Sequence, residues 1–287
     1  MHGFTPKDFM TCLTNTCPRT TIALSIVLVV PATVVRPSFG DLVVPTDGMV
    51  ILADTTFAPG TYVLPNGVSI GASGVTLDLN GAELVGTGGV EYGITSIGHD
   101  DVTIRNGIVR GYYYGLRIED CAGPTIATND LSDNYVDPLS LAPGAPFLNI
   151  NVGPMLPNFT NLGGGLYMLD VVGATVTGNT MRSGQNGMDL FFVTGGVIDG
   201  NDASDNTGWG IHLHGSTKNT VSNNTCDDCI RPGLGDSAGM LLVKGSSNNA
   251  IVGNSFRGGG VVAGAAEEGV AVFGLDGEEM SVAAGGD

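Results

Sequence analysis

The stretch GWGIHLHGSTKNTVSNNT, residues 208–225, contains both of the short units that recur along this chain. The first unit is a glycine followed by alternating apolar residues, here GIHLH from Gly210. The second is a run of β-branched residues that ends in asparagine, here TVSNN at Asn224. Alternation of this kind is typical of a β-strand with one buried face. The stretch therefore predicts two short strands joined by a turn.

Both units return along the chain at a regular spacing. The glycine unit begins at Gly93, Gly115, Gly165, Gly187, Gly210 and Gly239, with a weaker copy at Gly269. The asparagine unit ends at Asn80, Asn106, Asn129, Asn179, Asn201, Asn224 and Asn254, with a base period of 22 to 23 residues. Two strands in so short a repeat leave no room for a helix, and a fixed period is the signature of a solenoid.

These repeats predict an all-β fold, a single-stranded parallel β-helix in which each repeat forms one coil. Strands would pair with their counterparts in the coils above and below, and the asparagines would stack at one turn as an asparagine ladder. Side-chain amides suit such a place because they can satisfy buried backbone groups. A β-sandwich is the alternative, but it explains neither the fixed period nor the register of the asparagines.

Composition limits the classes of function. The chain has 287 residues, 46 of them glycine, and a net charge of −17. A nucleic-acid partner is not expected, because the sequence has no basic footprint. Strong acidity favours solubility in salt, bound cations, or a neutral or cationic partner, and it disfavours a polyanionic substrate unless Ca²⁺ bridges the two.

The first 40 residues are predicted to be a secretory signal peptide. Lys7 and Arg19 precede an apolar run at residues 21–35 that Pro31 interrupts, and small residues follow. This is the pattern of a cleaved signal, with an uncleaved anchor as the alternative. We expect a secreted, periplasmic or cell-surface protein with no stable membrane span after cleavage. The lone CxxC of Cys226 and Cys229 would then form a local disulfide.

The remaining residues, 41–287, are predicted to form the β-helix domain. Residues 135–162 are expected to be an inserted loop, and residues 230–238 a shorter one, both next to glycine-unit strands. Residues 258–287 have poor strand patterns and no evident cap, so we expect a weak or frayed C-terminal end. The sequence indicates no oligomeric state.

The chain resembles the right-handed parallel β-helix superfamily, which includes pectate lyases, alginate lyases and epimerases, and periplasmic copper-maturation proteins. The resemblance covers roughly residues 45–275 and rests on the asparagine repeat, on SSNNAIVGN at 246–254, and on an entry segment at 58–86. It implies a right-handed fold and an active site on the outer face of the glycine-unit strand. The catalytic motifs of these families are absent, and DPLS from Asp137 matches the epimerase motif only remotely.

The repeat register places two columns of side chains on that outer face. The first outer column is Thr95, Arg117, Tyr167, Asp189, His212 and Leu241, and the second is Ile97, Glu119, Leu169, Phe191, His214 and Val243. Neighbours in a column lie about 4.8 Å apart. Aromatic side chains at the adjacent turn, Trp209, Tyr92 and Tyr112 to Tyr114, are expected to stack on sugars.

From this register we assign four catalytic residues. His212 is the base and Asp189 orients it, because a carboxylate can hold an imidazole and raise its basicity. Tyr167 is the acid, and Arg117 binds a uronate carboxylate. The predicted ligand-binding residues are Trp209, His214, Glu119 and Phe191.

The sequence leaves several alternatives open. His212, His214 and Asp189 could instead hold Zn²⁺ or Cu²⁺, or the columns could be a plain solvated ladder. No cofactor is indicated with certainty. Ca²⁺ is the candidate for the turn acids Asp199, Asp202, Asp205, Asp227 and Asp228, although they lack the spacing of a calcium loop.

The predicted function follows from the columns and the resemblance. We expect action on a polysaccharide or cell-surface glycan, as a lyase or epimerase of uronate-containing glycan. The alternative is a non-catalytic β-helix that binds glycan or metal, or a structural surface protein.

Overall fold

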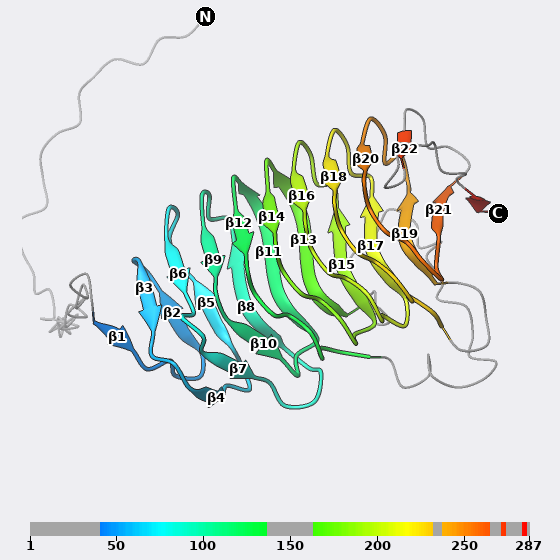
Figure 1. The fold of residues 1–287 in the computed structure, drawn as a ribbon. Helices are drawn as coiled ribbons and strands as arrows, with labels where there is room; N and C mark the ends of the chain where they lie inside the picture. The colour runs from blue at the N-terminus through cyan, green and yellow to red at the C-terminus, as the bar shows by residue number, and fades with distance from the viewer. Residues whose placement is uncertain (1–40, 137–162, 232–236, 265–270, 274–282, 286–287) are drawn as a thin grey trace, which may run out of the picture. The chain divides into compact units, whose positions relative to one another are not determined.

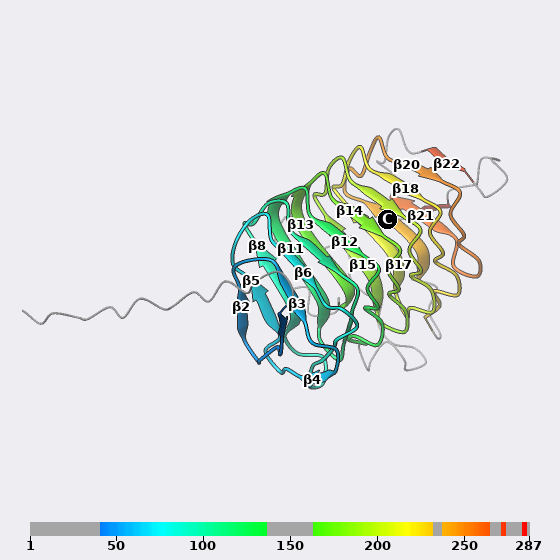
Figure 2. The same ribbon diagram turned by 60° about the vertical axis from the view of Figure 1, so that its left-hand side comes forward.

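The structure is a computed structural model that describes residues 41–136, 163–231, 237–264, 271–273 and 283–285. In these ranges the strands form three parallel sheets, called here sheets A, B and C. Each strand lies beside its counterpart in the next coil, as Figures 1 and 2 both show. This is the predicted parallel β-helix.

Sheet A contains the strands of the asparagine unit. Its strands in order are β1 (Leu42–Val43), β3 (Thr55–Phe57), β6 (Thr76–Asp78), β9 (Thr103–Arg105), β12 (Thr125–Ala127), β14 (Thr175–Thr177), β16 (Val197–Asp199), β18 (Thr220–Ser222), β20 (Ala250–Val252) and β22 (Ala271–Phe273). The last of these corrects one prediction. The weak glycine-unit copy at Gly269 leads into β22, which pairs with β20 in this sheet and not in sheet B.

Sheet B contains the strands of the glycine unit. Its strands in order are β2 (Met49–Ile51), β5 (Val68–Ile70), β8 (Tyr92–Ile97), β11 (Tyr114–Ala122), β13 (Gly164–Val172), β15 (Asn186–Phe191), β17 (Trp209–His214), β19 (Ala238–Val243), β21 (Val261–Gly264) and β23 (Ala283–Gly285). Strands β21 to β23 continue the pairing into the segment predicted to be weak or frayed, of which the rest lies outside the described residues.

Sheet C is short and closes the third side of the early coils. It consists of β4 (Thr61–Val63), β7 (Glu83–Val85) and β10 (Ile108–Arg110). Later coils continue this side through single parallel bridges, which run through Asp130, Thr180, Asp202, Thr225 and Ser255. The side remains regular although the residues there no longer form extended strands.

The apolar core runs through the inside of the coils. The residues that follow the repeat glycines, Leu116, Leu166, Met188, Ile211 and Met240, are all fully buried in it. This confirms the predicted inward column. Stacked aliphatic side chains of this kind bury apolar surface continuously along a solenoid, so each coil stabilises its neighbours.

The asparagine ladder is confirmed in the later coils. Asn129, Asn179, Asn201, Asn224 and Asn254 are buried, and each of the first four side-chain amides donates to the amide oxygen of the next at 2.9–3.2 Å. Each also donates to a backbone carbonyl, such as Ile126 O for Asn179 at 2.9 Å. The ladder therefore satisfies turn groups that the core would otherwise leave unpaired.

The first two predicted members of the ladder are wrong. Asn80 and Asn106 are exposed turn residues with positive φ angles of 48° and 61°. The ladder position next to Asn129 is Gly107, whose backbone N–H donates to the Asn129 amide oxygen. Asparagine tolerates the left-handed conformation, so a turn asparagine one residue earlier gave the same sequence pattern.

Two features of the turns differ from expectation. A second ladder, Asn219 to Asn249, lies at another turn, with an amide-to-amide distance of 3.0 Å. Cys226 and Cys229 are buried free thiols, so the predicted local disulfide is absent. Both side chains are buried among the coil interior, where Cys226 belongs to the apolar core.

Candidate functional site

The outer face of sheet B carries both columns in the predicted register. Arg117 pairs with Tyr167, Tyr167 with Asp189, and Asp189 with His212 along neighbouring strands. The second column runs in the same way through Glu119, Leu169, Phe191, His214 and Val243. The four predicted catalytic side chains therefore follow one another on successive coils, one on each.

The two ends of this face differ in exposure. Arg117 and Tyr167 are half-buried, whereas Asp189 and His212 are 0% and 1% exposed. The buried end is an apolar cluster outside the core, called here the outer cluster, made of Tyr114, Phe191, Trp209, Ala238 and Leu241. The expectation of a solvated ladder is wrong for this end, since outward-facing side chains are buried there.

Asp189 is the acceptor on which the buried polar groups converge. Its Oδ1 lies 2.9 Å from His212 Nδ1, and its Oδ2 accepts hydrogen bonds from Tyr114 Oη at 2.6 Å and Asn186 Nδ2 at 2.9 Å. Tyr114 and Asn186 are donors to the carboxyl group, whereas the direction of the His212 contact depends on the tautomer of the ring. The predicted Asp189–His212 contact is thus present, with two further partners.

The two ring nitrogens of His212 differ in their hydrogen bonding. Nε2 is buried and has no hydrogen-bond partner among the described residues. The ring packs against Trp209 at 5.0 Å, Phe191 at 5.3 Å and His214 at 5.9 Å between centroids. A buried polar atom without a partner is uncommon in native proteins and is found at functional sites. Nε2 is therefore the atom of this face that calls for a functional explanation.

Asn186 was not predicted as a site residue, and Tyr114 was predicted only as one of the aromatic side chains that stack on sugars. Both occupy the position just before a repeat glycine, which faces outward and forms a third column of Tyr92, Tyr114, Gly164, Asn186, Trp209 and Ala238. Strict alternation along the strand would point this position inward, into the core, because it lies two residues before an inward residue such as Leu116. The recurrence of an aromatic residue just before the repeat glycine, at Tyr92, Tyr114 and Trp209, is the signal that could have identified it.

Gly164 makes the contact between Tyr114 and Asp189 feasible. It is the register partner of both Tyr114 and Asn186, and it presents no side chain between them. A Cβ atom at Gly164 would lie 1.9 Å from Asn186 O, and the φ angle of 154° also favours glycine. Tyr114 therefore reaches the carboxylate of Asp189 two coils further along the sheet.

Arg117 lies away from the dyad. Its Nε donates to Glu119 Oε1 at 2.7 Å, and its guanidinium lies 4.7 Å from the ring centroid of Tyr92, on the preceding coil. Three coil spacings separate it from His212, or about 14 Å along the column. The structure does not bring Arg117 to the atoms around His212.

Tyr167 lies between these two groups. Its ring is 5.2 Å from Tyr114 and 5.5 Å from Phe191 between centroids. Burial, together with the nearby carboxylates of Glu119 and Asp189, raises the pKa of its hydroxyl well above the ordinary value. The phenol is therefore protonated at neutral pH and can act as a proton donor.

His214 is a neutral neighbour of the dyad. Burial, with the added effect of His212 and Lys244, lowers its pKa from 6.5 to about 4. Its ring lies 5.1 Å from Phe191 and 5.7 Å from Phe192 between centroids. Within the described ranges, no group of three His, Cys, Asp or Glu side chains could hold a metal ion. The predicted grouping of His212, His214 and Asp189 as metal ligands is thus not formed.

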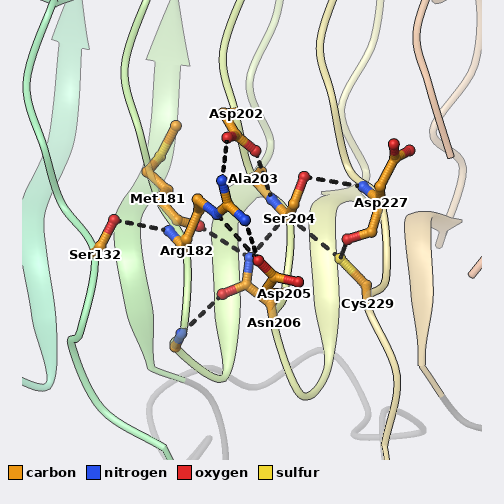
Figure 3. Close-up of polar contacts among 11 residues, drawn as sticks. Ser132, Met181, Arg182, Asp202, Ala203, Ser204, Asp205, Asn206, Asp227 and Cys229 are labelled. Carbon is orange, nitrogen blue, oxygen red and sulfur yellow. Dashed lines mark hydrogen bonds and ion pairs between the residues drawn. The ribbon is translucent and has the colours of Figure 1, made fainter. Parts of the chain in front are cut away.

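Four of the five turn acids proposed for Ca²⁺ are bonded within the protein, and they are Asp199, Asp202, Asp205 and Asp227. Asp202 and Asp205 form ion pairs with Arg182, as Figure 3 shows. Asp199 accepts from Ser222 Oγ at 2.6 Å and Asn223 Nδ2 at 2.8 Å, and these bonds lower its pKa. Asp227 accepts from Ser255 Oγ at 2.6 Å. The carboxylates of these four acids therefore bond to neighbouring turn side chains.

Several predicted features fall outside the described residues. They are the signal peptide at 1–40, residues 137–162 of the predicted inserted loop, and residues 232–236 of the shorter loop. The predicted walls beside the column therefore stay predictions. Over the ranges that the structure describes, no helix has the length and apolar character needed to cross a membrane.

Known proteins match this chain at the level of fold. Residues 157–278 match the family described as right handed beta helix region. Among solved structures, the chain is similar to the Dettilon tailspike protein (gp208), with 14% identity, 79% of this chain and 60% of that chain covered, and a TM-score of 0.32. The chain thus spans about 60% of the length of that tailspike chain.

A second similar structure is the A-module of the Azotobacter vinelandii mannuronan C-5 epimerase AlgE4. The identity is 15%, with 81% of this chain and 76% of that chain covered, and the TM-score is 0.35. A search of curated proteins found no match. The family match and the strand pairing together identify the fold as a right-handed parallel β-helix.

Proposed function

We propose that this chain acts on a polysaccharide by proton transfer, with His212 as the general base and Asp189 as the group that orients it. One observation carries the proposal: His212 contacts the Asp189 carboxylate through Nδ1, while Nε2 has no partner among the residues that the structure describes. An imidazole held in this way accepts a proton on the free nitrogen and shares the resulting positive charge with the carboxylate.

The reaction class proposed is that of a lyase or epimerase on a uronate-containing glycan. Both reactions begin with removal of the proton at C5, next to the carboxylate of the uronate. His212 Nε2 would take that proton, and Tyr167, whose raised pKa keeps it protonated, would supply one to the leaving oxygen or to the opposite face. Entry of a sugar requires this face to open, because Nε2 is buried.

Arg117 has a separate place in this proposal. Three inter-strand spacings place it about 14 Å from His212. This distance is greater than the width of one sugar ring. Arg117 would therefore bind the carboxylate of another uronate in the same glycan chain. Tyr92 lies against it and Glu119 binds its Nε, which leaves the two terminal nitrogens of the guanidinium for a ligand.

The second candidate function is non-catalytic glycan binding or a structural role. The burial of Asp189 and His212 beneath the outer cluster favours it, because a working base needs contact with its substrate. The net charge of −17 also favours it over action on a polyanion. On this alternative the polar cluster is a packing feature of the sheet.

The test is an activity assay on alginate and polygalacturonate, with and without Ca²⁺. Ultraviolet absorbance of the unsaturated product reports a lyase, and proton NMR of the recovered polymer reports an epimerase. We expect turnover in the native chain, and its loss in H212Q and D189N. H99Q is the matched control, since His99 lies in the turn after β8 and not in the columns.

Two results would contradict the proposal. Activity retained in H212Q would remove His212 from the reaction. Absence of both products in the native chain, together with glycan binding, would support the non-catalytic candidate.

Export belongs to the same proposal. We propose that residues 1–40 direct the chain out of the cytoplasm and are then removed. Mass spectrometry of the mature protein, made in its native host, would give an N-terminus near Asp41; an intact Met1 in exported material would contradict the cleavage.

A further inference from the structure

The environment of Asp189 decides where the proton of His212 lies. Tyr114 and Asn186 both donate to Oδ2, and His212 lies against Oδ1. All four side chains are nearly fully buried, so no solvent competes for these contacts. In such a place the direction of each hydrogen bond follows from which partners can donate.

The direction of the Asn186 amide is fixed by a backbone group. The N–H of Trp209 donates to Asn186 Oδ1 at 3.0 Å, and a backbone N–H cannot act as an acceptor. The oxygen of the amide therefore faces Trp209, and Nδ2 faces Asp189. Asn186 can only be a donor to the carboxylate.

Tyr114 is a donor for a second reason. Burial and the Asp189 charge raise the pKa of its hydroxyl well above the ordinary value. The phenol therefore keeps its proton and gives it to Oδ2 in a hydrogen bond of 2.6 Å. Two donors then stabilise the ionised carboxylate and hold its plane, so that Oδ1 is turned to His212.

We infer that Tyr114 and Asn186 are positioning residues that hold Asp189 so that His212 carries its proton on Nδ1 and leaves Nε2 unprotonated. A carboxylate held as an acceptor requires a donor at Nδ1. The opposite tautomer would place an N–H on buried Nε2, where no acceptor lies among the described residues, and would leave Nδ1 and Oδ1 as two facing acceptors.

The consequence for catalysis rests on the proposed function, but the tautomer does not. A base must present an unprotonated nitrogen to the substrate, and this arrangement presents Nε2. Loss of a positioning residue would reduce the share of His212 in the productive state. On the order of tenfold lower kcat with little change in KM is expected, the size of effect typical of outer partners of a functional group.

The experiment is nitrogen NMR of the full chain labelled with ¹⁵N-histidine. In the native chain we expect one His212 species at neutral pH, with Nδ1 as the protonated, pyrrole-like nitrogen and Nε2 as the unprotonated, pyridine-like one. In Y114F and in N186S we expect a mixture of tautomers. H212Q assigns the signals.

The matched control is Y112F. Tyr112 is buried two residues earlier and donates its hydroxyl to Leu64 O at 2.8 Å, so this variant loses the same group from the core. Its His212 signals should stay as in the native chain. Retained protonation of Nδ1 alone in Y114F and N186S, equal to Y112F, would overturn the positioning roles.

The native spectrum is decisive even if a variant fails to fold, since protonation at Nε2 there would overturn the inference directly. The two proposals can also fail separately. A tautomer shift in the variants with no glycan activity in the native chain removes the proposed function only. Activity that depends on His212, with unchanged tautomers in both variants, removes the positioning roles only.

Discussion

Two buried polar columns in this molecule show how differently the same solenoid can treat polar side chains. In the asparagine ladder, Asn201 accepts from Asn179 and donates to Asn224 and to Val176 O, so both ends of the amide are bonded. In the first outer column, both oxygens of Asp189 are bonded, but His212 Nε2 has no partner in the part of the chain that the structure describes. The ladder repeats and is satisfied, whereas the Asp189–His212 pair occurs once and is incomplete. Incomplete bonding in a well-packed fold is where function is expected.

The largest expected effect is the loss of one ladder amide. Asn201→Ala removes the amide oxygen that accepts from the Asn179 backbone N–H and the amide N–H that donates to the Val176 carbonyl in the buried turn. Each buried group left unpaired costs about 1 to 3 kcal/mol, so we expect a loss of about 3 to 4 kcal/mol in the free energy of unfolding. Urea unfolding followed by circular dichroism measures it.

The matched control for the ladder is Asn248→Gly. Asn248 is exposed, has a φ angle of 57° and makes only a 3.4 Å contact with Ser247 through its side chain. Glycine adopts this conformation without strain, so the change should be small. Equal destabilisation by the two variants would show that the ladder is not a special source of stability.

The second prediction concerns the incomplete column. His212→Gln keeps a donor for Asp189 and removes an atom that has no partner. We therefore expect a loss of about 1 kcal/mol or less in the free energy of unfolding, much less than for Asn201→Ala. The same urea titration measures it. If the free energy of unfolding fell as much as in Asn201→Ala, His212 would be a structural residue, and the two columns would not differ in this respect.

A third, pH-dependent effect comes from His214. Because its pKa is lowered from 6.5 to about 4, the unfolded chain binds a proton in this window that the folded chain does not. Stability should therefore fall as the pH drops from about 6.5 towards 4. His214→Gln should flatten this part of the profile, measured as the urea midpoint against pH. His99→Gln serves as the control, and an equal flattening there would contradict the assignment.

The smallest expected effect is on the turn acids of Figure 3. Arg182 pairs with Asp202 and Asp205, but its side chain is 44% exposed. Exposed ion pairs contribute about 0 to 1 kcal/mol and are screened by salt. Arg182→Met should therefore lower the urea midpoint slightly at low salt and less at high salt. A loss that is large and independent of salt would place Arg182 in the same class as the ladder.

Much of this architecture could be predicted from the sequence, because the solenoid repeats itself. The period fixed the register, so the neighbours Asp189 and His212 followed from counting along the repeat. The errors arose where one residue departs from the repeat. Asn106 has a left-handed turn conformation that imitates a ladder position, and Tyr114 belongs to the outer cluster although strict alternation would place it in the core. Burial of the outer face could not be read from the strand pattern, because it depends on contacts outside the strand.

Gly164 has a consequence for how this chain could be shortened or lengthened. In an ideal solenoid each coil interacts only with its two neighbours, so whole coils can be added or removed like modules. The absent side chain at Gly164 lets Tyr114 bond to Asp189 across an intervening coil. The coils are therefore not interchangeable at this point. Deleting the coil of β13 would change the partner of Tyr114. Deleting a coil elsewhere in the asparagine ladder would bring one ladder asparagine next to another.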